Sequence, residues 1–265
     1  KLRIFAQAAA ACVNLDCDHA DRVLEAARKS CPRIITFSQT DPSATIFGSQ
    51  VRKAGGDILF RVKTPRYSRE FRLTMPGLFN VQNALAALAV CEAVGVPEQY
   101  AFAGLMKARV PGRMEVYANA DEKVSVIVDY AHNRLSFETL FRSVREEYPG
   151  RRIVTVFGCG GNHDRAKRPL MGEAVARLSD VAVLTSDNPR HEEPEAIMAD
   201  VMPGLSGAAE VFADPDRRRA IEKGLELLHP GDALLIAGKG HESTQQIGDV
   251  KHPFSDQQTV REILG

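Results

Sequence analysis

Four polar segments of the chain carry residue types that bind charged ligands. These segments are Asp129–Asn133, Gly158–Asp164, Ser186–Arg190 and Gly238–Glu242. In the first, the Asp129 carboxylate could accept hydrogen bonds from ribose hydroxyls, and His132 could contact a phosphate or a base. The alternative is that Asp129 only caps the helix that follows.

The glycine-rich segment Gly158–Asp164 is suited to an anion. Its glycines let backbone amides approach a ligand, and the predicted following helix presents its N-terminal dipole there. Arg165, Lys167 and Arg168 add positive charge. The segment is neither a GxxxxGK(S/T) phosphate loop, which occurs nowhere in the chain, nor a GxGxxG turn. A tight turn before a solvated basic helix is the alternative.

The last two segments suit an amino-acid ligand. Asp187 and Asn188 precede a proline, which predicts a turn with side chains along the crevice at a strand end. Arg190 could bind a carboxylate through two parallel hydrogen bonds. Gly238 exposes backbone, while Glu242 could bind an ammonium group.

The elements that must position these segments alternate between strand and helix. From about residue 113, apolar runs occur at 124–129, 153–157, 181–186, 210–212 and 233–237, with helical stretches near 135–147, 168–178, 193–204 and 215–228. Apolar strands separated by helices predict a mainly parallel sheet covered on both faces. Ligands of such sheets bind beyond the carboxyl ends of the strands, and each polar segment follows a predicted strand.

The earlier part of the chain shows a mixed pattern. Strands are predicted at 10–15, 33–37, 46–51, 58–62 and 70–73, and helices at 18–31, 80–95 and 97–107. The break between the two parts is expected near Pro111 and Gly112. The fold class is therefore predicted to be α/β.

Composition excludes several kinds of partner. The 265 residues contain 34 Lys plus Arg and 34 Asp plus Glu, so no strong overall field favours nucleic acid or an anionic membrane. No apolar run approaches the roughly 20 residues of a membrane span, and the first residues do not resemble a signal peptide.

The five cysteines are odd in number and show no CxxC spacing. Cys12 and Cys17 lie near His19 but lack a second ligand pair, so no metal site is predicted. Reduced thiols in a cytoplasmic protein are the interpretation that fits.

Seven ordered blocks resemble the Mur ligase family of peptidoglycan synthesis, most closely the branch that adds the third amino acid of the stem peptide. The blocks are residues 77–83, 111–115, 129–132, 158–161, 167–172, 187–190 and 238–242. The resemblance implies an ATP- and Mg²⁺-dependent acid–amino-acid ligase. In that family ATP phosphorylates the carboxylate of UDP-MurNAc-dipeptide, and the incoming amine attacks the acyl phosphate. Small-molecule substrates and a monomer are therefore expected.

The resemblance also assigns nucleotide contacts. Asn80 and Asn83 would face the adenine, Arg113 would approach the nucleotide, and Asp129 would hold the ribose with His132 nearby. The alternative for Asn80 is that it satisfies amides at a helix start.

The block at residues 187–190, Asp-Asn-Pro-Arg, is the family's mark for meso-diaminopimelate. By resemblance, Asn188 and Arg190 would recognise its distal carboxylate and amine, with Asp187 in the same block and Gly238 and Glu242 completing the pocket. Lysine lacks that carboxylate and would leave a buried guanidinium unpaired, so lysine is disfavoured.

Two blocks depart from the family pattern. The family usually reads GGDRD after the glycine loop, and its arginine contacts the α-carboxylate of the amino acid. Here His163 stands at that position, and Arg165 is a possible replacement. In the segment DYAHTPD, the proline and second acid are replaced at Arg134 and Leu135.

The family's phosphate loop, carbamylated lysine and Mg²⁺ ligands have no counterpart in the sequence. We therefore expect residues 1–110 to be the second half of the central ATP-binding domain and residues 111–265 the Rossmann-like C-terminal domain. No catalytic or metal-ligating residue is assigned, and this chain alone is expected to be inactive. The alternatives are a non-catalytic nucleotide- or amino-acid-binding paralogue, and a lysine-adding or otherwise divergent Mur-type ligase.

Overall fold

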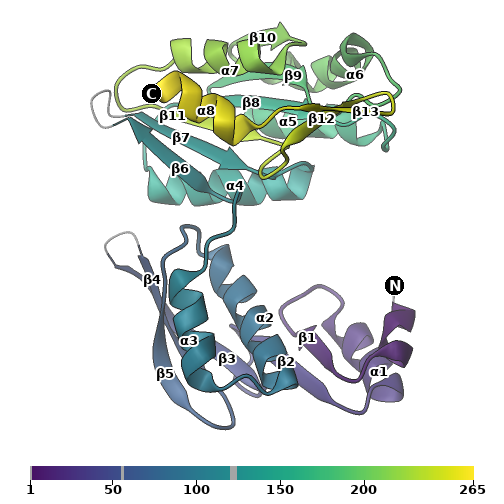
Figure 1. Cartoon of the computed structure of the whole chain (residues 1–265), viewed down its shortest axis with the longest axis vertical. Coiled ribbons are helices and arrows are strands. Elements are labelled where there is room, and N and C mark those ends of the chain that lie inside the picture. The colour runs from purple at the N-terminus through teal and green to yellow at the C-terminus, as the bar shows by residue number, and fades with distance from the viewer. Residues whose placement is uncertain (1, 55–56, 120–123) are drawn as a thin grey trace. The chain divides into compact units, whose positions relative to one another are not determined.

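The computed structural model describes residues 2–54, 57–119 and 124–265. The chain divides into two compact units, Lys1–Arg109 and Val110–Gly265 (Figure 1). Each unit has its own sheet and its own apolar core.

The first unit is built on a five-stranded sheet. In spatial order the strands are β1 (Ala11–Asn14), β2 (Ile34–Ser38), β3 (Ile46–Ala54), β4 (Asp57–Lys63) and β5 (Ser68–Leu73). The first three strands are parallel, and the β3–β4 and β4–β5 pairs are antiparallel. The predicted strands are confirmed, whereas the sequence made no prediction of their directions.

The helices of this unit are the short 3₁₀ helix η1 (Leu2–Gln7), α1 (Ala20–Ser30), α2 (Phe79–Val94) and α3 (Glu98–Lys107). The Ala- and Leu-rich α2 packs on β2 and β3 and buries Val81, Leu85 and Leu88. It ends at Gly95, whose left-handed φ of 74° suits glycine.

The second unit is built on a six-stranded sheet. In spatial order the strands are β10 (Val211–Asp214), β9 (Val181–Ser186), β8 (Ile153–Cys159), β11 (Ala233–Ala237), β7 (Val124–Asp129) and β6 (Glu115–Asn119). All neighbours are parallel except β6 and β7. The predicted mainly parallel sheet is confirmed.

Helices cover both faces of this sheet. One group is α4 (Arg134–Glu147), α5 (Lys167–Leu178) and α6 (Pro194–Val201), which continues as the 3₁₀ helix η2 (Met202–Gly207); the other is α7 (Arg217–Glu226) and α8 (Asp256–Leu264). Every residue of β7, β8, β9 and β11 is buried, as two-sided cover requires (Figure 1). The helix predicted for 193–204 is divided at Met202, next to Pro203, which has no N–H to donate.

A hairpin of β12 (Thr244–Ile247) and β13 (Val250–Pro253) follows β11. A bridge between Arg190 and Ile247 joins this hairpin to the loop after β9. The sequence did not predict the hairpin, β6 or α8. β12 and β13 are short and largely polar, so they lack the apolar alternation that marks a strand.

Candidate functional site

A pocket of about 330 Å³ opens at the carboxyl ends of the parallel strands in the second unit. Its lining includes residues that directly follow β7, β8, β9 and β11. β11 enters the sheet between β7 and β8, and ligands of such sheets bind where the strand order reverses. The pocket therefore lies where the fold predicts a ligand.

The structure brings most of the predicted site residues to this pocket. Lining it are His132 and every amino-acid-binding candidate except Arg165: His163, Asp187, Asn188, Arg190, Gly238 and Glu242. The lining also includes Lys167 and Arg168, which the sequence analysis named as cations of an anion-binding segment, and four residues of its polar segments that it gave no role of their own: Tyr130, Asn133, Cys159 and Asp164. Met171 carried no expectation as a site residue.

Asn188 and Glu242 meet across the pocket although they follow different strands. Asn188 Nδ2 donates to Glu242 Oε2 at 2.8 Å. Lys239 Nζ donates to the same carboxylate oxygen at 2.9 Å. Burial acts to raise the pKa of Glu242, but the hydrogen bonds from Asn188 and Lys239 outweigh it and hold that pKa below its usual value. Glu242 is therefore ionised at neutral pH.

Arg190 is held by the hairpin and by the glycine-rich loop. Its backbone N–H donates to Gln246 at 3.0 Å, and its φ is 53°, an uncommon value for a residue with a side chain. Its Nη1 donates to the Gly161 carbonyl at 2.7 Å. A Cβ on Gly160 would lie 3.0 Å from Arg190 Nη1 and 3.1 Å from His163 Cδ2. The glycine therefore lets a guanidinium and an imidazole share one side of the pocket.

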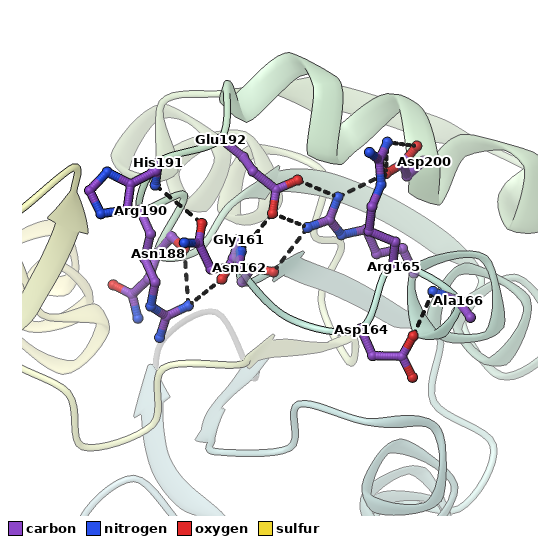
Figure 2. A network of polar contacts seen from close by, with 12 residues as sticks. Gly161, Asn162, Asp164, Arg165, Ala166, Asn188, Arg190, His191, Glu192 and Asp200 are labelled. Carbon is purple, nitrogen blue, oxygen red and sulfur yellow. Dashed lines mark hydrogen bonds and ion pairs between the residues drawn. The ribbon is translucent and has the colours of Figure 1, made fainter.

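The loops after β8 and β9 are bonded to each other (Figure 2). Gly161 N–H donates to the Asn188 carbonyl at 2.9 Å, and Asn162 N–H donates to Glu192 Oε1 at 2.6 Å. Both Arg168 Nη atoms donate to the Glu192 carboxylate, at 2.8 and 2.9 Å. The bonds from Arg168 lower the pKa of Glu192 to about 2.

Arg165 and Arg168 do not behave as a solvated basic helix start. Arg165 is exposed and pairs with both oxygens of Asp200 in α6, at 2.9 and 3.1 Å, outside the pocket (Figure 2). Arg168 is only 2% exposed and also donates to Asp200. The structure therefore does not bring Arg165 to the amino-acid candidates, and the solvated-helix alternative is wrong for Arg168. Lys167 lines the pocket, and its side-chain ammonium has no hydrogen-bond partner among the described residues, although its backbone N–H donates to the Asp164 carbonyl at 3.3 Å.

Asp187 lies against the backbone of the segment after β11. A Cβ on Gly238 would lie 2.7 Å from Asp187 Oδ2, and Gly238 has a φ of 116°, so this approach requires glycine. Burial raises the pKa of Asp187, although the charges of Arg217 and Lys239 act against it.

Asp129 holds a turn at the end of β7. Its two carboxylate oxygens accept from the Met114 and Ala131 N–H groups at 2.8 and 2.7 Å. Burial raises its pKa despite these bonds. Asp129 does not cap α4; that cap is Asn133, in a capping box with Ser136. The helix-capping alternative for Asp129 is therefore wrong.

Arg113 and His132 gather around the Tyr130 ring. The Arg113 guanidinium lies 4.8 Å from the ring centroid, and the rings of His132 and His241 lie 4.8 and 5.2 Å from it. His132 Nδ1 is 2.9 Å from the Tyr130 carbonyl. The cluster offers a cation and flat faces, which suit a nucleotide.

Asn80 and Asn83 belong to the first unit, at the start of α2. Asn80 is buried and its Nδ2 donates to the Pro76 carbonyl at 2.7 Å. Asn83 is exposed and donates to Asn80 Oδ1 at 2.9 Å. The Asn80 side chain thus stabilises the turn before the helix, and it does not satisfy a backbone amide at the helix start.

Within residues 2–54, 57–119 and 124–265, no group of three or more His, Cys, Asp or Glu side chains could hold a metal ion. All five cysteines are free, and burial raises the pKa of Cys159 to about 12. A search of the described part of the chain found no helix long and apolar enough to cross a membrane.

Two family models match the chain. The Mur ligase middle domain matches residues 1–91, and the model described as the Mur ligase, glutamate ligase domain matches residues 112–240. UDP-N-acetylmuramoyl-L-alanyl-D-glutamate–2,6-diaminopimelate ligase from Lawsonia intracellularis (strain PHE/MN1-00) is 46% identical over 246 residues, which is 89% of this chain and 50% of that protein. The enzyme of that name from Aquifex aeolicus (strain VF5) is 40% identical over 254 residues, 96% of this chain and 51% of that protein. The chain thus spans about half the length of the curated relatives it matches.

Solved structures agree. One of a UDP-N-acetylmuramoyl-L-alanyl-D-glutamate–2,6-diaminopimelate ligase matches 99% of this chain and 55% of its own, with 34% identity and a TM-score of 0.58. A folylpolyglutamate synthase from Mycobacterium tuberculosis, solved with ADP and AMPPCP, matches 97% of this chain and 55% of its own with a TM-score of 0.70; at 19% identity it shows likeness of fold alone. The two family models, the identities and the fold lead to one conclusion: the chain belongs to the Mur ligase family.

Proposed function

We propose that the whole protein, at the length of its relatives, is an ATP-dependent ligase that adds meso-diaminopimelate to UDP-MurNAc-dipeptide through an acyl phosphate. The relatives named for this reaction are 46% and 40% identical to the chain. The pocket described above would bind the incoming amino acid. The whole protein is proposed to act as a monomer, and ATP and a UDP-linked substrate suit a cytoplasmic enzyme.

One observation carries the choice of amino acid: the pocket combines cationic and anionic groups from the ends of two strands, β9 and β11. Arg190 and the Asn188 amide offer N–H donors to a carboxylate, while Glu242 and Asp187 offer oxygens to an ammonium group. A diamino dicarboxylic acid carries both kinds of group at both ends. His163 lines the same pocket, on the side where Gly160 leaves room for it and for Arg190, and it would contact a second carboxylate.

Contacts with ATP are proposed on each unit taken by itself. Arg113 and His132 flank the Tyr130 ring and suit a base or phosphate, and Asp129 shapes the turn that carries them. Asn80 and Asn83 are the candidates of the first unit. The described residues do not form a carboxylate or imidazole cluster that fits Mg²⁺, so no step is assigned to it here.

The chemistry asks two things of this pocket. It must deliver a neutral amine to the acyl phosphate. It must also hold the charged groups of the amino acid so that this amine is positioned for attack. The Arg190 backbone is hydrogen-bonded to Gln246 and its guanidinium to Gly161. Because Arg190 is held at both points, it would fix the position of the bound amino acid.

The test is phosphate release by the protein expressed from the complete reading frame, with ATP, UDP-MurNAc-dipeptide and either meso-diaminopimelate or L-lysine. We expect kcat/KM for meso-diaminopimelate to exceed that for lysine by at least about 100-fold, since lysine leaves the Arg190 guanidinium unpaired. Arg190→Ala should remove most of this preference. Equal kcat/KM values for the two amino acids, in both the wild type and Arg190→Ala, would show that the pocket does not recognise a distal carboxylate.

A further inference from the structure

Lys239 is a fully buried lysine whose ammonium group has three acceptors. The residue is 0% exposed. Its Nζ donates to Asn188 Oδ1 at 3.1 Å, to Glu242 Oε2 at 2.9 Å and to the Thr244 carbonyl at 2.7 Å. An ammonium has three N–H donors, so each is used. Burial of a charge costs free energy unless it is paired and hydrogen-bonded, and both conditions are met here.

These bonds fix which way the Asn188 amide faces. Asn188 Oδ1 accepts from Lys239 and from the Gln246 N–H at 2.9 Å, so both of its lone pairs are used. Its Nδ2 donates one hydrogen to Glu242. The second Nδ2 hydrogen has no partner among the described residues, and Asn188 lines the pocket. Asn188 can therefore offer the pocket a donor and not an acceptor.

The same bonds set what Glu242 offers. Its Oε2 accepts from both Asn188 and Lys239, while its Oε1 has no hydrogen-bond partner in the described part of the chain. The buried ammonium keeps the carboxylate ionised, so Oε1 remains a charged acceptor at the pocket.

Backbone geometry directs the lysine inward. Gly238 and Gly240 on either side have φ values of 116° and 51°, and a Cβ on Gly240 would lie 2.7 Å from both the Gly112 carbonyl oxygen and Tyr130 Cβ. The turn is therefore built closely around Lys239 and leaves little freedom for its side chain.

We propose that Lys239 is the positioning residue that sets the amino-acid specificity of the pocket: it turns a donor of Asn188 toward the substrate carboxylate and presents Glu242 Oε1 to the substrate ammonium. Lys239 touches no substrate atom itself. This inference rests on the proposed function, because it deepens the role of the same pocket.

The experiment is steady-state kinetics of Lys239→Met in the protein expressed from the complete reading frame. Methionine keeps an unbranched side chain as far as Cε and removes the ammonium with all three of its donors. We expect KM for meso-diaminopimelate to rise at least about tenfold, with KM for ATP within about twofold and kcat within about threefold. Lys239→Gln retains two N–H donors without the charge and should give a smaller rise. Lys223→Met, on α7, where the lysine side chain is 41% exposed, is the matched control and should leave all three constants unchanged.

Two outcomes overturn the inference. One is a KM for the amino acid that does not change in either Lys239 variant; the other is an equal loss in every constant, which would mark a purely structural role. If Lys239→Met does not fold, the same comparison of KM for meso-diaminopimelate, KM for ATP and kcat in Lys239→Gln tests the inference. Nuclear magnetic resonance of the ¹⁵N-labelled wild-type protein adds a second readout: meso-diaminopimelate should shift the Asn188 side-chain amide, and an unmoved amide would contradict the proposal. A wild-type protein that turns over no amino acid would instead refute the proposed function, and the inference with it.

Discussion

At the scale of single residues, the pocket is shaped by charges that bind protein groups rather than ligand. Arg168 and Glu192 are the clearest pair, because they join the start of α5 to the loops after β8 and β9. Through Arg168 and Glu192, hydrogen bonds connect the loop that carries Asn188 and Arg190 to the glycine-rich loop. Their effect on binding is therefore indirect: they hold the groups that would touch the amino acid.

This pair has a consequence for acid stability. The pKa of Glu192 is lowered from 4.5 to about 2, so the folded state favours its ionised form. Its contribution to stability is fully present above pH 4.5 and is lost as the pH falls toward 2. We expect the free energy of unfolding, measured by urea titration between pH 5 and 2, to fall less steeply in Glu192→Gln than in the wild type. Identical slopes would mean that Glu192 is not held by Arg168 in solution.

Residue roles were only partly predictable from sequence. Most amino-acid-binding candidates do lie in one pocket, because strand-end segments of a parallel sheet must meet at the same edge. Arg165 is not among them, since its side chain turns to Asp200, a residue of a helix whose position no local pattern reveals. Lys239 was not singled out, because a lysine between two glycines is typical of an exposed turn.

At the scale of elements, the apolar strands were predictable and the polar ones were not. β7, β9 and β11 have the predicted bounds, since a run of buried β-branched residues is a strong local signal. β12, β13 and α8 depend instead on contacts with parts of the second unit that are distant in the sequence. One of these contacts is buried: Arg217, the first residue of α7, pairs with Asp256, the first residue of α8.

That ion pair ties two helix starts to the sheet. Both side chains are 0% exposed, and Arg217 also donates to the carbonyls of Ser186 and Ala237 at the ends of β9 and β11. Asp256→Asn would leave a buried guanidinium without its counter-charge, so we expect a loss of about 3–5 kcal/mol in the free energy of unfolding. Thermal or urea denaturation measures this loss. Glu262→Gln, which breaks an exposed pair with Arg218, is the control and should cost far less.

At the scale of the whole molecule, nucleotide and amino-acid candidates are distributed over two units. The sequence of this chain contains no GxxxxGK(S/T) phosphate loop. We therefore expect the 265-residue chain to release no phosphate from ATP above background, with or without meso-diaminopimelate, in a coupled phosphate assay. Turnover by this polypeptide would show that phosphoryl transfer does not need such a loop here.

The hairpin of β12 and β13 places a condition on when the pocket can exist. Asn188 is held by Glu242 and by Gln246, which lie 54 and 58 residues later in the chain. Contacts of such sequence separation close large loops and form late in folding. During synthesis, a ribosome would have to release nearly the entire second unit before the arginine-bearing loop gained its partners. A nascent chain would thus lack the completed pocket until its last strands had emerged.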